Sequence, residues 1–225
     1  MAITYVGAGT GIGSYGSTGA SSTFSFGSSV TANTDVLVLL TSTGPVNPGT
    51  TTVSDNLNGN WTQLCNVWNA TNGTSLLAFF VQATTTGDPN ITVACTNNPN
   101  AYFSFLQFTG FAHTATADSS AGGYSFSDTA VTPLSRATAS NYNNEILLAL
   151  LKVQQFYSPD PPTGWTQLES ITYYYAIEAT PTSVPFTTTF GTASTYDIQT
   201  FGIYDLQSIA ATPLMVTRKN VLYFI

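Results

Sequence analysis

Few residues in this chain have side chains suited to catalysis. The only histidine is His113, in the segment FAHTATADSS, and a nucleophilic triad would have to use it. Paired carboxylates for glycoside hydrolysis would have to come largely from Glu145, Glu169 and Glu178. We interpret His113 as a solvated linker residue and the glutamates as strand residues, because no spacing places two of them across a cleft. The sequence therefore predicts a protein that is not an enzyme.

Two segments match binding motifs in part but lack the surroundings that those motifs need. GIGSYG (11–16) has the G-x-G-x-x-G spacing, with Asp35 about 20 residues further on, but no helix follows to hold a pyrophosphate. SDNLNGN from Ser54 lacks the first and last carboxylates of a calcium loop. Cys65 and Cys95 either pair or stay reduced as small buried residues, and we favour the reduced state. We predict no cofactor and no bound metal.

The composition narrows the class of protein. Charged residues make up 7% and hydrophobic residues 43%, and the polar positions are filled mainly by Thr, Ser, Asn and Gly, which favours strands and turns over helices. The net charge is −7, and four scattered basic residues are too few to hold a phosphate backbone, so we expect no nucleic acid partner. The apolar runs are shorter than the roughly 18 residues of a membrane span, and the first residues do not resemble a signal peptide. We expect a chain that folds inside a cell and does not contact membranes.

The tetrapeptide WTQL occurs twice, at residues 61–64 and 165–168. Around it, the apolar strand DVLVLLTS from Asp35 matches EILLALLK from Glu145, and YFSFLQFTGF from Tyr102 matches IQTFGIYDL from Ile198, in the same order. We interpret this as one structural unit present twice. The predicted organisation is a glycine- and serine-rich N-terminal arm (1–23), unit 1 (24–111), a linker (112–123), unit 2 (124–206) and a C-terminal arm (207–225).

The strand patterns predict an all-β fold, an antiparallel β-sandwich with jelly-roll-like character. In FSFLQFTGF, Phe103 and Phe105 fall on one face of a strand and Leu106 and Phe108 on the other, so both faces are apolar. A unit of about five strands is short for a sandwich of its own. We expect the two units to close over a shared core, and the alternative is two small sandwiches in tandem.

A turn precedes each WTQL segment. Asn58-Gly59 predicts a type I′ hairpin, in which both residues have positive φ, and the second unit has a proline-rich loop that ends at Gly164. The tryptophan after each turn either packs in a sheet or offers a platform for a sugar ring, and we favour packing.

The C-terminal arm ends in the apolar run VLYFI. Such a run is costly in water unless it docks, so the arm either completes its own sheet or adds a strand to a neighbouring subunit. The candidate contact residues of the arm are Leu214, Met215, Val216, Arg218, Lys219, Val221, Leu222, Tyr223, Phe224 and Ile225.

The order of these motifs resembles β-sandwich, jelly-roll-like domains of tailed-phage virions, which are found on capsid decoration proteins, fibres and tail components. The resemblance rests on the hairpin DNLNGNW (55–61), the closing strand LQFTGF (106–111) and PPTGWTQL (161–168). It implies a fold and a setting, and it transfers no catalytic or ligand residue.

The resemblance implies a non-enzymatic structural protein of a phage particle, assembled in the host cytoplasm and located in the virion. The leading hypothesis is a capsid decoration or cement protein whose partners are other copies of itself, as a dimer or trimer, and a major capsid protein. One alternative is a glycan-binding module on a fibre or tail, with Trp68, Tyr173, Tyr174 and Tyr175 as candidate stacking residues. A tail or baseplate component is a further alternative.

Overall fold

The computed structural model describes residues 2–8, 13–14, 21–43, 46–97, 101–118, 124–130, 134–136, 142–153, 160–168, 173–180, 182–188 and 194–206. Every named element among them is a β-strand, and all strand pairs are antiparallel. The predicted all-β, antiparallel sandwich class is confirmed. The C-terminal arm lies outside the described residues.

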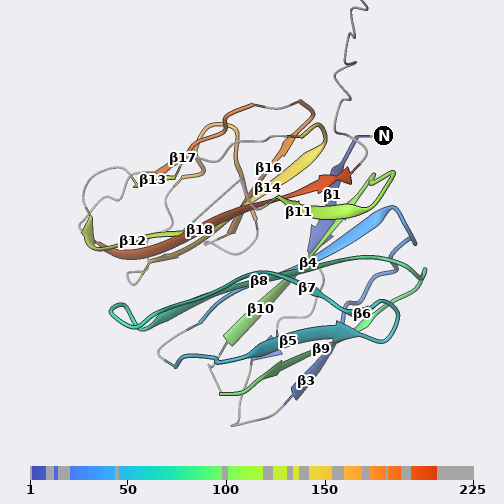
Figure 1. Cartoon of the computed structure of the whole chain (residues 1–225), viewed down its shortest axis with the longest axis horizontal. Helices are drawn as coiled ribbons and strands as arrows, with labels where there is room; N and C mark the ends of the chain where they lie inside the picture. Colours follow the sequence, from blue (N-terminus) through green and yellow to red (C-terminus); the bar gives the residue numbers. More distant parts are fainter. Residues whose placement is uncertain are drawn as a thin grey trace, which may run out of the picture.

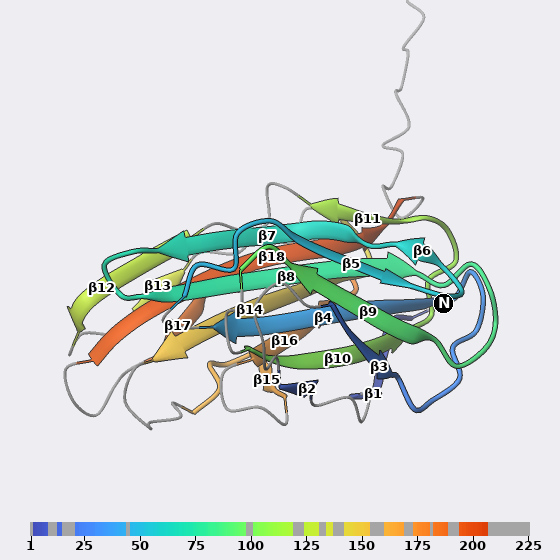
Figure 2. The ribbon, with the colours of Figure 1, turned by 90° about the horizontal axis from the view of Figure 1, so that it is seen from below.

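The strands form two inner and two outer sheets, stacked as four layers (Figure 1). The first inner sheet has the order β1 (Thr4–Ala8), β10 (Ala101–Thr109), β4 (Asp35–Thr43), β8 (Thr74–Gln82) and β7 (Thr62–Asn69), and β2 (Gly13–Ser14) also pairs with β10. The first outer sheet has the order β3 (Ser21–Ser25), β9 (Asn90–Cys95), β5 (Thr51–Asp55) and β6 (Gly59–Asn60), and lies across the first inner sheet (Figure 2).

The second half of the chain forms the other two layers. The second inner sheet has the order β11 (Ala115–Asp118), β18 (Ser194–Asp205), β14 (Glu145–Val153), β16 (Tyr173–Glu178) and β15 (Thr166–Gln167), and β12 (Tyr124–Ala130) also pairs with β18. The second outer sheet consists of β13 (Leu134–Arg136) and β17 (Phe186–Thr188). The two inner sheets have the same strand order, position by position, which is the order that a repeated unit predicts. The sequence repeat itself stays a prediction.

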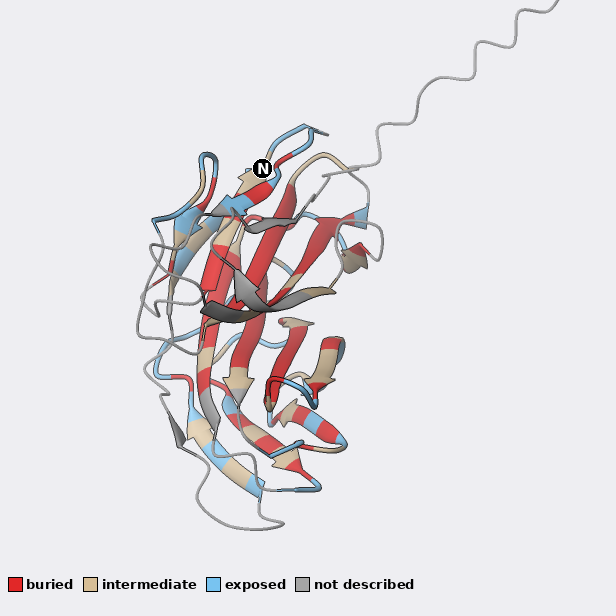
Figure 3. Ribbon diagram, turned by 90° about the vertical axis from the view of Figure 1, so that its left-hand side faces the viewer, coloured by how far each residue is buried: buried red, intermediate tan, exposed pale blue. Residues whose placement is uncertain are grey.

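Three apolar cores separate the four layers. The junction core lies between the two inner sheets and takes Val38 and Leu40 from β4 and Ile146 and Leu148 from β14. Each inner sheet also packs against its own outer sheet. Leu39 of β4 lies in the first outer core, and Leu147 of β14 lies in the second outer core. Since alternate side chains of an inner strand face two different cores, these strands read as continuous apolar runs. Figure 3 shows inner strands that are buried along much of their length, whereas an outer strand alternates between buried and exposed residues.

The predicted alternation in the closing strand of unit 1 is confirmed. Phe103 and Phe105 of β10 lie in the first outer core, and Leu106 and Phe108 lie in the junction core. The sequence left open whether the units share a core or stand in tandem. Both descriptions apply, because each unit is a sandwich with its own core and the two sandwiches pack back to back through their inner sheets.

The structure differs from the predicted unit boundaries. The predicted N-terminal arm contains β1, β2 and the first three residues of β3. The predicted linker contains β11, which pairs with β18 along the edge of the second inner sheet. These segments join the sheets because the edges of β10, β9 and β18 offer unpaired backbone groups, and because Ile3 and Tyr5 add apolar side chains to the junction core.

The hairpin before the first WTQL exists, but the predicted type I′ turn is wrong. Asp55 pairs with Gly59 around a turn of residues 56–58, and among these positions Gly59 alone has positive φ, at 79°. The reason is the Asp55 carboxylate, whose Oδ1 accepts hydrogen bonds from the backbone nitrogens of Leu57 and Asn58, both at 2.7 Å. This side-chain acceptor stabilises a different turn from the two-residue one.

Candidate functional site

The aromatic residues proposed to stack on glycans are mostly not available for that role. Tyr174 is fully buried in the second outer core, and Tyr173 is buried in the junction core, so the prediction that these two rings offer a surface is wrong. Tyr175 is half-buried and packs against Tyr5, with ring centroids 5.1 Å apart. Trp68 is half-buried on the edge strand β7. These tyrosines lie on β16, a strand of the second inner sheet. They are buried because this sheet lies between two other layers, which the sequence pattern did not reveal.

The two repeated tryptophans pack in cores, as favoured from the sequence. Trp61 lies in the first outer core at 6% exposure, and Trp165 lies in the second at 5%. The Trp61 indole nitrogen donates a hydrogen bond to Oδ2 of Asp55 at 2.7 Å, which ties the turn to the core. The Trp165 ring packs edge-on against Phe186, with centroids 5.1 Å apart. WTQL therefore marks a packing position in each sandwich.

Most buried acidic residues serve as hydrogen-bond acceptors inside the fold. Asp35 is 3% exposed and accepts hydrogen bonds from Thr31 N at 2.8 Å, Gln107 Nε2 at 2.7 Å and Thr109 Oγ1 at 2.6 Å. With these three donors around it, this carboxylate ties the segment before β4 to β10 and fixes the local backbone. The sequence offered Asp35 as the acid of a dinucleotide motif, and its buried position at the start of β4 excludes contact with a ribose there.

A cluster of polar residues joins the two units at the tip of the β7–β8 hairpin. We define the junction clamp as Asp197 of β18 with its donors Asn69, Asn72, Thr74 and Tyr124. Asp197 is 1% exposed, and Asn69 Nδ2 and Asn72 Nδ2 donate to it at 2.6 and 3.0 Å. The Thr74 and Tyr124 hydroxyls also donate to this carboxylate. Three of the four donors come from unit 1, so the clamp fixes the register between units.

The sequence interpretation did not single out the clamp residues. Two signals were present, an aspartate within the strand STYDIQTFGIYD and the amide-rich turn NATNGT between two strands. A buried carboxylate needs donors, and an asparagine-rich hairpin tip can supply them. The missing information was which turn faces which strand.

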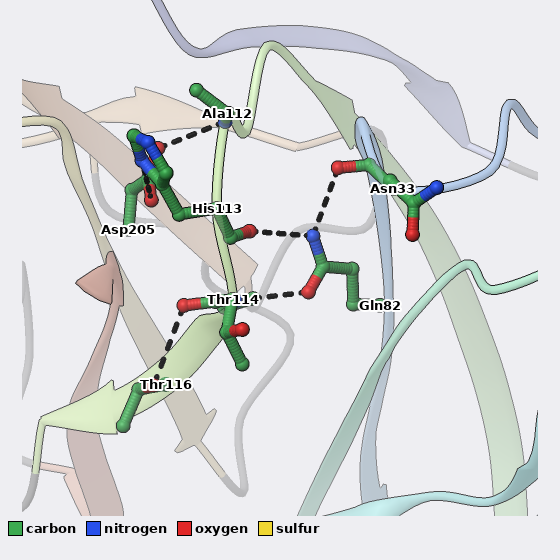
Figure 4. A network of polar contacts seen from close by, with 8 residues as sticks. Asn33, Gln82, Ala112, His113, Thr114, Thr116 and Asp205 are labelled. Atoms are coloured by element: carbon green, nitrogen blue, oxygen red, sulfur yellow. Dashed lines mark hydrogen bonds and ion pairs between the residues drawn. The ribbon is translucent and has the colours of Figure 1, made fainter. Parts of the chain in front are cut away.

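A second polar network holds the connection between the units (Figure 4). Gln82 Nε2 donates to the carbonyls of Asn33 at 2.9 Å and His113 at 2.6 Å, and Ala115 N donates to Gln82 Oε1 at 3.0 Å. The buried carboxylate of Asp205 accepts a hydrogen bond from Ala112 N at 2.8 Å and lies 2.9 Å from His113 Nδ1. His113 is exposed, as predicted for a solvated residue, but its ring is also anchored on Asp205, which the sequence did not predict.

A histidine paired with an aspartate is two parts of a catalytic triad. The nucleophile of a triad would have to reach the other ring nitrogen of His113. The hydroxyl residues that follow His113 in the sequence are Thr114 and Thr116, and Thr116 Oγ1 instead donates to the Thr114 carbonyl at 3.4 Å.

The glutamates give no cleft pair either. Glu145 is fully buried at the start of β14, opposite Glu178, whose partial burial raises the pKa of its carboxyl. Glu169 lies outside the described residues.

The remaining motif residues have structural positions. Cys65 lies in the junction core and Cys95 in the first outer core, and both are free thiols, as favoured from the sequence. In the part of the chain that the structure describes, no group of three or more His, Cys, Asp or Glu side chains could hold a metal ion. Of the segment GIGSYG, the described residues include Gly13 and Ser14, which form β2.

The outward face of the first outer sheet has a uniform chemical character. It carries hydroxyl, amide and methyl groups and no charge across its three longer strands, and the Thr23 and Thr92 hydroxyls lie 3.1 Å apart. Its outward residues are Ser21, Thr23, Ser25, Thr52, Ser54, Asn90, Thr92 and Ala94. A surface without charges loses little hydration energy when another protein covers it.

No protein-family model, no curated protein and no solved structure matches this chain. No helix in the described ranges has the length and apolar character that crossing a membrane would need.

Proposed function

We propose that this chain is a non-enzymatic structural protein of a phage particle, a capsid decoration or cement protein that associates with copies of itself and with a major capsid protein. In this proposal it folds in the host cytoplasm and ends in the virion. The phage setting comes from the resemblance of the DNLNGNW hairpin and the LQFTGF strand to virion domains.

The observation that carries the proposal is the location of the described acidic side chains, which are mostly buried, together with an outer face that has no charge. Six acidic residues are buried in the part of the chain that the structure describes, namely Asp35, Asp55, Asp118, Glu145, Asp197 and Asp205. Those with described donors hold turns or the contact between the units. The outer sheet face described above is left uncharged. A rigid double sandwich with such a face suits a protein that covers other proteins, because few charges must be desolvated on contact.

A glycan-binding module on a fibre or tail is the second candidate function. It is favoured by Trp68, a half-buried ring on an edge strand whose neighbour Asn66 already binds the Gly49 carbonyl through its amide at 3.2 Å. A ring beside amide groups is a common sugar-binding arrangement. A tail or baseplate component differs from the leading proposal only in its place in the particle.

The test is the solution mass of the full-length chain and of a version that ends at Leu206, measured by light scattering. We expect a dimer or trimer for the full chain, and a loss of association on truncation if residues 207–225 make the contact. A monomer at every concentration in both versions would refute self-association. Binding of the monomer to a glycan array, abolished by Trp68→Ala, would then favour the second candidate.

A further inference from the structure

The first strand of the chain is an edge strand with a single partner. β1 pairs with β10, from Thr4 opposite Thr109 to Ala8 opposite Leu106, and β2 continues along the same edge with Gly13 opposite Phe103. β1 and β2 thus both pair along one side of β10. Without them, the backbone groups on that side of β10 would have no strand partner.

We call the edge of β10 and the side chains that contact Ile3 and Tyr5 the seat of β1. This seat is more specific than a bare sheet edge. Ile3, at 4% exposure, belongs to the junction core, and the Tyr5 ring packs between Phe108 of unit 1 and Tyr175 of unit 2, with centroids 5.5 and 5.1 Å away. β1 therefore closes the side where the two inner sheets meet (Figure 1). Removing it would expose an apolar slot that accepts two side chains spaced two residues apart.

The entry to this seat requires a glycine. Gly110 has φ of 100°, and a Cβ atom there would overlap the Ala2 carbonyl oxygen and lie 3.1 Å from Ile3 Cα. The backbone before β1 thus lies directly against the backbone after β10. Only a residue without a Cβ atom allows the two backbone segments to lie this close together.

From this seat we propose that β1 and β2 exchange between copies of this chain, so that the first strand of one copy fills the β10 edge and the apolar slot of another. The partner is a second copy, because residues 3–5 of that copy carry the same isoleucine and tyrosine at the required spacing. This inference rests on the self-association in the proposed function and specifies the element that carries it.

The connections of the chain favour exchange of β1 over exchange of other edge strands. Residues 15–20, YGSTGA, lead from β2 in the inner sheet to β3 in the outer sheet and span up to about 20 Å when extended. Both copies therefore keep all other strand pairs during exchange. Short connections of this kind invite strand exchange, because the exchanged state repeats every native contact.

The outer side of β1 disfavours the addition of a further strand. The register of β1 shifts between Tyr5 and Gly7, and the extra residue Val6 is 54% exposed. A bulge of this kind disrupts the free edge, so a further strand adds poorly to it. Reciprocal exchange gives a closed dimer, or a closed trimer when three copies exchange in a ring.

The test uses the full-length variant Thr4→Cys with Thr109→Cys, whose cysteines would face each other across β1 and β10. Oligomer and monomer are separated by size, oxidised and run on a denaturing gel without reductant. We expect covalent dimers or trimers from the oligomer peak and monomers with an internal disulfide from the monomer peak. The unsubstituted chain should give no covalent oligomer, because Cys65 and Cys95 are buried.

The matched control is Thr116→Cys with Tyr204→Cys, which places the same pair across β11 and β18. β11 is the corresponding edge strand of unit 2, but residues 110–114 join it directly to β10, so it should form an internal disulfide in every peak. An oligomer peak of the first variant that contains internal disulfides alone would overturn exchange and leave self-association standing. A chain that stays monomeric at all concentrations would overturn both.

Discussion

At the scale of single residues, the two repeated tryptophans provide an internal comparison. The Trp61 indole nitrogen donates to the Asp55 carboxylate at 2.7 Å, whereas the Trp165 indole nitrogen has no acceptor among the described residues. We expect Trp61→Phe to lower the free energy of unfolding by about 1.5–3 kcal/mol more than Trp165→Phe, because a hydrogen bond to a charged group is lost. Urea denaturation of both variants measures the difference, and equal losses would contradict it.

The buried thiol of Cys65 makes stability depend on pH in alkaline solution. Burial raises the pKa of this thiol from 9.0 to about 12. Above about pH 9 the unfolded chain releases the proton while the folded chain keeps it, so the free energy of unfolding falls as pH rises toward 12. The contribution of one thiol to this slope is at most about 1.4 kcal/mol per pH unit. Cys65→Ala should flatten the slope between pH 9 and 12, and an unchanged slope would argue against the assignment.

At the scale of elements, the seat of β1 can be tested with two glycines of similar conformation. Gly110 and Gly59 both have positive φ, but only a side chain at Gly110 would collide with the β1 backbone, since the space around Gly59 is open. We expect Gly59→Ala to cost about 1 kcal/mol through backbone strain, and Gly110→Ala to cost at least about 2 kcal/mol more. Hydrogen exchange should show faster exchange in β1 for Gly110→Ala alone. Equal costs without a change in β1 would mean that β1 does not lie against Gly110.

The sequence predicts an element correctly when the residues that determine it are close together in the chain. The apolar runs from Val36 and Ile146 and the alternation around Phe105 identify strands that are buried on both faces, because side-chain period is a local property. The turn at Asn58 was mispredicted because a side chain outside the pair, Asp55, selects the turn type. The burial of Tyr174 and the pairing of Asp197 with Asn72 depend on how whole sheets stack, which no short window contains.

At the scale of the whole molecule, the junction core decides whether the two sandwiches unfold together. Each inner sheet buries one of its faces only against the other, through residues such as Leu40 and Leu148, and the junction clamp adds buried hydrogen bonds across the same contact. A unit that unfolded alone would leave the inner sheet of the other unit exposed to water, which is costly because the exposed face is apolar. We therefore expect a single unfolding transition.

Tryptophan fluorescence can follow each unit separately. Trp68→Phe with Trp165→Phe leaves Trp61 as the reporter of unit 1, and Trp61→Phe with Trp68→Phe leaves Trp165 as the reporter of unit 2. Within each variant, fluorescence and far-ultraviolet circular dichroism should give the same urea midpoint, because the one tryptophan and the strands of both units report the same transition. Adding Leu148→Ala should lower that midpoint in both backgrounds by removing about 2–5 kcal/mol of packing. If the Trp61 midpoint stayed fixed while the Trp165 midpoint fell, the sandwiches would be independent domains, and the junction core would hold them together without coupling their folding.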